Sequence, residues 1–264
     1  MDCDLPPETP EATIPRGRMT YLGSRQFPVE LHDKVVEYMV DGLPVQVFLT
    51  GPNRFAAVNF RAELLPPVLF INKFISHVGI LTFLRRTKFI SDGQEKAWHP
   101  VNEDGIVPEM RAKFLKFLTD LNKLVDGDGS FQSAVRKLAI EDVTTPRQEY
   151  LPVAPFCNNF PNLTELELEI FYTEVLDQRR RRPLPVGDVL LNLKLHEIFS
   201  LRNLLRLVIR VKVPTLVASP HMVENRVHKV NKFVEVLKPA LVSRFELLKR
   251  GVKVVVVVDK QEGW

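Results

Sequence analysis

The chain has few of the residues that cross-link a fold or loosen it. Only two of its 264 residues are cysteines, Cys3 and Cys157. Two cysteines cannot build a disulfide scaffold, and a chain of this length does not need one. Glycine is scarce at 12 residues, whereas proline reaches 20. This balance predicts many defined turns and few flexible loops.

Segments that direct a chain to a membrane are also lacking. The first residues, Met1-Asp2-Cys3-Asp4, have neither the basic nor the apolar region of a secretory signal. The sequence holds no run of 18 apolar residues that would span a bilayer. We therefore expect a cytoplasmic or nuclear protein with no membrane partner, in which the glycosylation sequon Asn162-Leu163-Thr164 plays no part.

Motifs that carry catalysis or hold a cofactor are missing as well. The histidines form no His-x-x-x-His or His-Glu-x-x-His pair, and His221 and His228 have no cysteine or acidic partner to complete a zinc set. The string Asp126-Gly127-Asp128-Gly129-Ser130 is similar to a calcium loop, but Phe131 and Lys137 stand where that loop needs glycine and glutamate. There is no Gly-x-Ser-x-Gly string, phosphate-binding glycine loop or dinucleotide fingerprint. We predict that the protein is not an enzyme and uses no cofactor or metal.

The charge balance is mild, with 36 lysines and arginines against 32 acidic residues and a net charge of +4. Basic and acidic residues are mostly interleaved, whereas a nucleic-acid binder usually gathers its positive charge on one face. The exception is Arg179-Arg180-Arg181-Arg182, which precedes Pro183-Leu184-Pro185. We interpret it as an exposed loop, with a contact for an acidic partner or a localisation signal as the alternatives.

The first part of the chain has a tail and a short helix. Residues 1–20 are rich in proline and acidic residues, so we expect them to be disordered. Pro28 then suits the first turn of a helix in which Leu31, Val35 and residues 38–39 recur at helical spacing. This helix should end near Asp41-Gly42.

Further elements follow up to residue 125. Two apolar runs, residues 45–49 and 55–60, flank a Thr-Gly-Pro-Asn turn and predict a β-hairpin. A second helix is expected from residue 67 to about residue 83, closed by a strand at residues 87–90. A third helix is expected over residues 108–125.

A repeated apolar string is the most informative feature. Residues 135–140 form a short strand pattern, and residues 163–170 and 204–211 repeat it as Leu-x-x-Leu-x-apolar-x-apolar. Both longer copies are preceded by asparagine, Asn162 and Asn203. Aligning Leu138, Leu166 and Leu207 gives periods of 28 and 41 residues. The first period is typical of leucine-rich repeats, and the second leaves room for a longer inserted helix or loop.

The last part of the chain predicts a helix at residues 221–250 and a fully buried strand at residues 252–258. Strands separated by helices predict parallel pairing with right-handed crossovers, and therefore an α/β fold. The alternative to a repeat is a plain α/β core in which the Leu-x-Leu strings are coincidental.

The order of these pieces resembles the fungal F-box-like family. Residues 27–31, Phe-Pro-Val-Glu-Leu, are similar to the family's first helix, and residues 67–73, Pro-Val-Leu-Phe-Ile-Asn-Lys, to its second. Residues 83–90 are similar to the strand that follows, and residues 160–166 to its later leucine-rich strands. With the tail at 1–20 set apart by its composition, the resemblance implies an F-box-like helical region with a hairpin at 21–125 and a leucine-repeat-like parallel sheet with crossover helices at 126–264.

Membership of this family would imply an adaptor of a cullin-type ubiquitin ligase. The F-box helix would dock on the Skp-type subunit through the apolar set Phe27, Pro28, Leu31 and Val35. The repeat region would hold the substrate protein.

The repeat strands themselves offer charged residues for a protein partner. Glu165 and Glu167 alternate with the apolar residues of one strand, and Arg206 and Arg210 do so on another. The alternative is that these acidic and basic strands pair with each other. A rival function is the binding of nucleic acid or an anionic surface by the arginines at 179–182, together with Arg202, Arg206 and Arg210.

Overall fold

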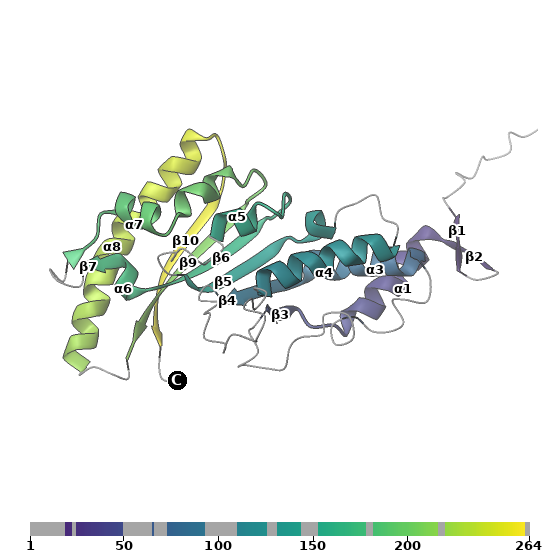
Figure 1. Cartoon of the computed structure of the whole chain (residues 1–264), viewed down its shortest axis with the longest axis horizontal. Coiled ribbons are helices and arrows are strands. Elements are labelled where there is room, and N and C mark those ends of the chain that lie inside the picture. Colours follow the sequence, from purple (N-terminus) through teal and green to yellow (C-terminus); the bar gives the residue numbers. More distant parts are fainter. Residues whose placement is uncertain are drawn as a thin grey trace, which may run out of the picture.

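The computed structural model describes residues 19–22, 25–49, 65, 73–92, 110–125, 131–143, 153–177, 182–215 and 220–261. Its centre is a six-stranded sheet (Figure 1) in which every neighbouring pair of strands is parallel. The strands are β3 (Gln46–Leu49), β4 (Lys88–Asp92), β5 (Lys137–Val143), β6 (Glu165–Phe171), β9 (Arg206–Pro214) and β10 (Lys253–Gln261). The α/β class and the parallel pairing are therefore confirmed.

The order of strands in space follows their order along the chain, β3-β4-β5-β6-β9-β10. Parallel strands are joined by right-handed crossovers, so a chain that always adds its next strand on the same side places its connections on one face of the sheet. The main core lies on that face, and the other face carries the charged residues described below.

The register of the sheet places one apolar residue from every strand in a single row. The three aligned leucines, Leu138, Leu166 and Leu207, are direct neighbours. Phe89 and Val47 extend the row on one side and Val254 on the other, and all six side chains are buried. The strand predictions at residues 135–140, 163–170 and 204–211 are therefore confirmed, and the sequence alignment of the leucines is also their alignment in space.

Helices pack along the sheet from one end of the strand order to the other (Figure 1). They are α1 (Val29–Asp41), α3 (Lys73–Arg86), α4 (Met110–Val125), α5 (Val153–Cys157), α6 (Tyr172–Val175), α7 (Val186–Asn192) and α8 (Pro220–Leu247), with 3₁₀ turns η2 (Phe131–Ala134) and η3 (Leu195–Ser200). Two small antiparallel pairs complete the description, β1 (Met19–Leu22) with β2 (Arg25–Pro28) and β7 (Leu176–Asp177) with β8 (Arg182–Pro183). No helix of the described segments is long and apolar enough to cross a membrane.

Large side chains fill the space between sheet and helices. Phe114 of α4 lies between Phe89 and Phe160, with ring centroids 4.8 Å and 6.0 Å away, and Phe160 meets Phe156 edge-on at 5.2 Å. On α8 a buried stripe repeats every three or four residues: Val230, Phe233, Leu237, Leu241 and Phe245. Each buried aromatic ring contributes about 2–3 kcal/mol to folding by leaving water.

On α1, among the side chains that the structure describes, Val36 and Val40 are buried, whereas Val35 and Tyr38 are 44% and 85% exposed. The exposure of Val35 agrees with its expected place in the apolar docking set. The prediction of a fully buried strand at residues 252–258 is wrong, since Val257 is 37% exposed. This strand is the last of the sheet and has a strand neighbour on one side only, within the described residues.

Other boundaries differ in detail. Phe27 and Pro28 belong to β2, and the helix begins at Val29 and ends at Asp41, as expected. Strand β3 pairs in parallel with β4, while residues 55–60, the other arm of the expected hairpin, lie outside the described residues. Met19 and Thr20 belong to β1, and the central sheet takes strands from both sides of residue 125.

Candidate interaction surface

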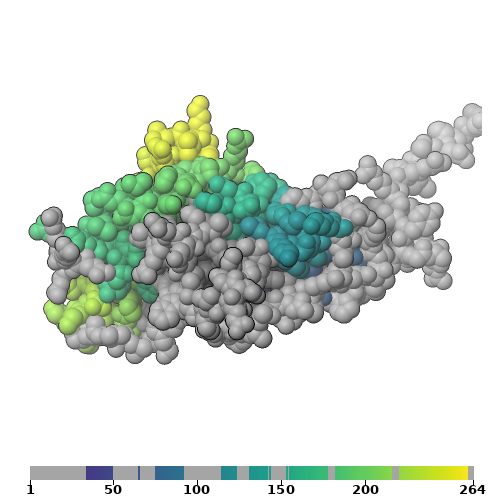
Figure 2. Space-filling model, in the orientation of Figure 1, coloured from purple at the N-terminus to yellow at the C-terminus, as the bar shows by residue number. Residues whose placement is uncertain are grey.

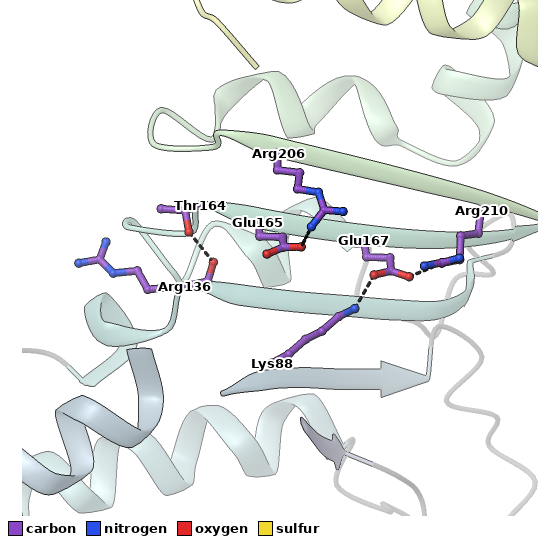
Figure 3. Close-up of polar contacts among 7 residues, drawn as sticks. All are labelled: Lys88, Arg136, Thr164, Glu165, Glu167, Arg206 and Arg210. Atoms are coloured by element: carbon purple, nitrogen blue, oxygen red, sulfur yellow. Dashed lines mark hydrogen bonds and ion pairs between the residues drawn. The ribbon is translucent and has the colours of Figure 1, made fainter. Parts of the chain in front are cut away.

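The face of the sheet opposite the main core carries a group of charged side chains from β4, β6 and β9 (Figure 3). Alternation along β6 places Leu166, Leu168 and Ile170 in the core and turns Glu165 and Glu167 to this face. We call this group the charged ladder and define it as Lys88, Glu165, Glu167, Glu169, Arg206, Arg210 and Lys212.

The outer step of the charged ladder joins Glu165 and Arg206. These residues are direct neighbours in the register of β6 and β9, and the Arg206 guanidinium donates to the Glu165 carboxylate at 2.6 Å. Half of the Arg206 side chain remains exposed. An ion pair with this much exposure contributes about 0–1 kcal/mol.

The inner step is held from two sides. One oxygen of Glu167 accepts a hydrogen bond from Arg210 of β9, and the other accepts one from Lys88 of β4. Lys88 reaches Glu167 across β5, where the residue beside Glu167 in register is Ala139 (Figure 3). The methyl group of alanine leaves room for the lysine to cross, and only 14% of the Glu167 side chain is exposed.

In this inner step, Glu167 and Arg210 each shift the pKa of the other. Burial raises the pKa of Glu167, but the hydrogen bonds from Lys88 and Arg210 outweigh burial and hold that pKa below its ordinary value. The hydrogen bond to Glu167 in turn raises the pKa of Arg210. Each partner therefore stabilises the charged form of the other, and Glu167 is an anion at neutral pH.

A third step lies further along the same strands. Glu169 is 9% exposed, and its carboxylate forms an ion pair with Lys212 of β9. Near the charged ladder the same face carries Ile90, Ala139 and Val208, which are buried although they do not belong to the main core. The face is therefore a mixture of paired charges and apolar residues.

The loops that precede the strands form a second ladder, made of hydrogen bonds. The carbonyl of Arg136 accepts from the backbone N–H groups of Thr164 and Glu165, and the carbonyl of Thr164 accepts from those of Leu205 and Arg206. Arg136, Thr164 and Leu205 each stand two residues before an aligned leucine. The loops that enter β5, β6 and β9 therefore lie side by side, and each is joined to the next by the same pair of backbone hydrogen bonds.

The structure brings some of the predicted site residues together. Glu165 contacts Arg206 and Glu167 contacts Arg210, so the cross-strand pairing considered from the sequence is formed. Val35 is exposed on α1, a helix that packs on α3 and does not contribute to the charged face. Phe27, Pro28 and Leu31 belong to β2 and α1, but their side chains lie outside the described residues, as do the whole residues Arg179, Arg180 and Arg181.

Sequence reasoning missed Lys88 and Ala139. Their role depends on β4 and β6 lying two strands apart, which no local pattern in the sequence reports. Asn162 and Asn203 were noted for their position before the repeat strands, but their contact with each other was not predicted.

Comparisons with protein-family models, with curated proteins and with solved structures find no match to the chain. Within the described residues, no group of three or more histidine, cysteine, aspartate or glutamate side chains is placed to hold a metal ion. The functional proposal therefore depends on the geometry of this chain and on the F-box-like order of its sequence elements.

Proposed function

We propose that the chain is a non-catalytic protein–protein interaction module, and more specifically a substrate-recruiting adaptor of a cullin-type ubiquitin ligase. In this proposal the α1 region binds the Skp-type subunit and the parallel sheet, with its leucine-repeat-like strands, binds the substrate protein. The observation that carries the proposal is the two-sided character of α1.

Helix α1 has one anchored side and one exposed side. Val36 and Val40 are 1% and 0% exposed and attach the helix to the core, whereas Val35 and Tyr38 face solvent. Val35 and Tyr38 are three positions apart and so lie on the same side of the helix, where one partner surface would cover both. Tyrosine is also among the residue types enriched at protein interfaces.

The sheet supports the second half of the proposal. The aligned leucines share one row, and the loops before β5, β6 and β9 repeat the same backbone step. Repeat proteins of this kind present an extended face built from equivalent positions of successive strands, which suits a large protein ligand. On this face the charged ladder supplies both signs of charge.

Binding of nucleic acid is the weaker alternative. A phosphate-binding surface needs cations that are available to phosphate, whereas Arg206 and Arg210 are each paired with a glutamate of β6. These two arginines should then add little to an affinity for duplex DNA, and a salt titration with a log–log slope near zero would agree with the protein-binding proposal.

The experiment is co-purification of the full chain with a Skp-type subunit from cell extract. Val35→Asp combined with Tyr38→Asp should remove the subunit from the purified complex, because the two charges would be desolvated in the interface. Lys232→Asp, an exposed change on α8 away from α1, is the control and should retain it. If the wild-type chain does not co-purify with the subunit, the adaptor role is wrong.

The wider proposal, that the chain is a protein–protein interaction module with any partner, is tested by a separate measurement. The same wild-type, double and control variants can be compared for every protein that they retain from the extract. Loss of a specific protein in the Val35→Asp, Tyr38→Asp variant alone would support an interaction through α1 with another partner. Identical sets of retained proteins would contradict binding through α1.

A further inference from the structure

The last strand of the sheet, β10, has a free edge in the part of the chain that the structure describes. Its pairing partner β9 lies on one side, and the backbone N–H of Lys253 donates to the carbonyl of Leu205 at 2.8 Å. Successive residues of a strand turn their backbone groups to opposite sides. The N–H and C=O groups of Val254, Val256 and Val258 therefore point away from β9.

The apolar layer over this edge is incompletely covered. Val256 and Val258 of β10 are only partly buried, as are Val227, Val234 and Val242 of α8, although all five pack against the core. Helical spacing places the three α8 valines on one side of the buried stripe. Arg226 and Arg244, which lie over the rings of Tyr172 and Phe199, mark the other side, toward α6 and η3.

A stack of repeated strands usually ends in a polar cap, because its last unit would otherwise leave apolar surface in water. At this end of the protein the last strand, β10, is instead a run of valines. Figure 2 shows atoms of the C-terminal part of the chain, in yellow, at the surface of the molecule. Long apolar edges are templates for pairing with another chain.

The sequence of the strand is complementary to itself. It reads Lys253, five valines and Asp259, so a cation and an anion stand at equal distances from Val256. In its own sheet Lys253 lies beside Arg206, another cation. A strand running in the opposite direction would bring the carboxylate of Asp259 opposite this lysine.

We propose that β10 is a homodimer interface, in which it pairs antiparallel with β10 of a second copy of this chain about a two-fold axis at Val256. Val256 then faces its own equivalent, Val254 faces Val258 of the other copy, and Lys253 faces Asp259 of the other copy. The backbone groups that point outward belong to Val254, Val256 and Val258, which are the residues that exchange hydrogen bonds in this register.

The remaining geometry agrees with this register. Lys253 and Asp259 fall at a position without backbone hydrogen bonds, where opposite side chains approach most closely, at a Cα separation of about 4.5 Å. The two residues are an even number of positions apart, so both lie on the face of the charged ladder. Each copy keeps α8 on the same face of the joined sheet, so the partly exposed valines of α8 and β10 lie near those of the other copy. A closed interface of this kind uses the same patch on both copies.

The first test measures the mass of the full chain by light scattering over a range of concentrations. The wild-type chain should move from monomer to dimer, and Lys253→Glu or Asp259→Lys alone should raise the dissociation constant by about tenfold, because like charges then face each other. The double variant should restore the wild-type constant. Lys232→Glu, which changes an exposed lysine of α8, is the control for net charge. A chain that stays monomeric at every concentration overturns the proposal.

The second test separates the backbone from the side chain. Val256→Ala and Val256→Pro both lose the valine side chain, but only proline lacks the N–H that points outward. Proline is tolerated on an edge strand when its missing N–H would face away from the sheet. The proline variant should therefore remain folded by circular dichroism and become monomeric, whereas the alanine variant should retain the dimer. A dimer that survives the proline substitution uses another surface and contradicts the proposal.

The third test reads the register. Two chains are prepared on a Cys3→Ser background, one with Lys253→Cys and one with Asp259→Cys, and are oxidised separately and after mixing. Only the mixture should form a disulfide-linked dimer in high yield, because the proposed register places positions 253 and 259 together. Identical positions of the two copies lie about 20 Å apart in this register, at about 3.4 Å per residue. Equal cross-linking in the separate samples would overturn the register and with it the proposal.

Discussion

The side-chain amide of Asn203 donates a hydrogen bond to the side-chain oxygen of Asn162 at 3.1 Å, although 41 residues separate the two. The same amide nitrogen donates to the carbonyl of Pro161 at 2.8 Å, and the amide of Asn162 donates to the carbonyl of Ser133 at 3.0 Å. A chain of amides thus connects the turns that precede β5, β6 and β9. Because an asparagine side chain both donates and accepts, it can continue such a chain from one repeat to the next.

Asn162→Ala should lower the free energy of unfolding by about 1–3 kcal/mol, because it leaves the partly buried carbonyl of Ser133 without this donor and ends the chain of amides. Asn203 is exposed, so water replaces its bonds more easily and Asn203→Ala should cost less. Asn231→Ala, on the exposed side of α8, is the control. Urea unfolding of the single and double variants gives the coupling energy. Additive effects of the two alanine substitutions would mean that the contact between Asn162 and Asn203 contributes no stability.

The charged ladder predicts that two glutamates of one strand differ in their effect on stability. Glu167→Ala removes the common partner of Lys88 and Arg210, which lie on either side of it, and should cost about 2–3 kcal/mol. Glu165→Ala removes one exposed ion pair and should cost less than about 1 kcal/mol. Both changes replace a glutamate of β6 by alanine. The difference between the urea midpoints of the two variants therefore reports the different surroundings of the two carboxylates. Equal losses would show that the contacts of Glu167 with Lys88 and Arg210 add nothing.

The lowered pKa of Glu167 also predicts a dependence of stability on pH. A carboxylate whose pKa is lower in the folded chain than in the unfolded chain contributes stability above its ordinary pKa, and this contribution disappears as the pH falls through the folded value. The difference in unfolding free energy between the wild-type chain and Glu167→Gln should therefore be largest near neutral pH and shrink as the pH falls below the ordinary pKa of a glutamate. Denaturant unfolding at several pH values measures it. A difference that stays constant, or grows toward acid, would contradict the assignment.

Much of the sheet was predictable because its information is local. Apolar alternation identified the strands at residues 135–140, 163–170 and 204–211, and the alignment of Leu138, Leu166 and Leu207 gave their register in space. The helices α4 and α8 followed from apolar spacing, since a helix of four or more turns contains enough periods to define its buried side. Helix α1 is shorter, and its exposed Val35 and Tyr38 obscured the side formed by Val36 and Val40.

The contacts of the candidate surface were less predictable, because they depend on distance in space. The sequence offered Glu165 and Glu167 for pairing with Arg206 and Arg210, since both strands alternate in the same way. Nothing local indicated that Lys88 would cross β5 above Ala139 to reach the same glutamate. That contact requires the order of strands and the register together, and neither can be read from residues 85–92 alone.

Arg250 connects the end of α8 to η3, the turn that precedes β9. Its guanidinium donates to the backbone carbonyls of Phe199 and Leu201 and lies over the ring of Phe245, 5.4 Å from the centroid. Phe245 also packs on Phe199, so the arginine closes a cluster that joins α8 to η3. A planar guanidinium serves two acceptors and a ring at once, which a lysine ammonium cannot do.

Arg250→Lys should therefore lower the free energy of unfolding by about 1–2 kcal/mol although the charge is kept, because two carbonyls lose a shared donor and the ring loses its stacked partner. Burial lowers the pKa of Arg250, so the charged group has a desolvation cost that only good geometry offsets. Arg202→Lys, an exposed change near the same turn, is the control and should alter the urea midpoint little. Hydrogen exchange should show faster opening of the last turns of α8 in Arg250→Lys than in the control. If the two variants exchange at the same rate there, Arg250 does not hold the end of this helix.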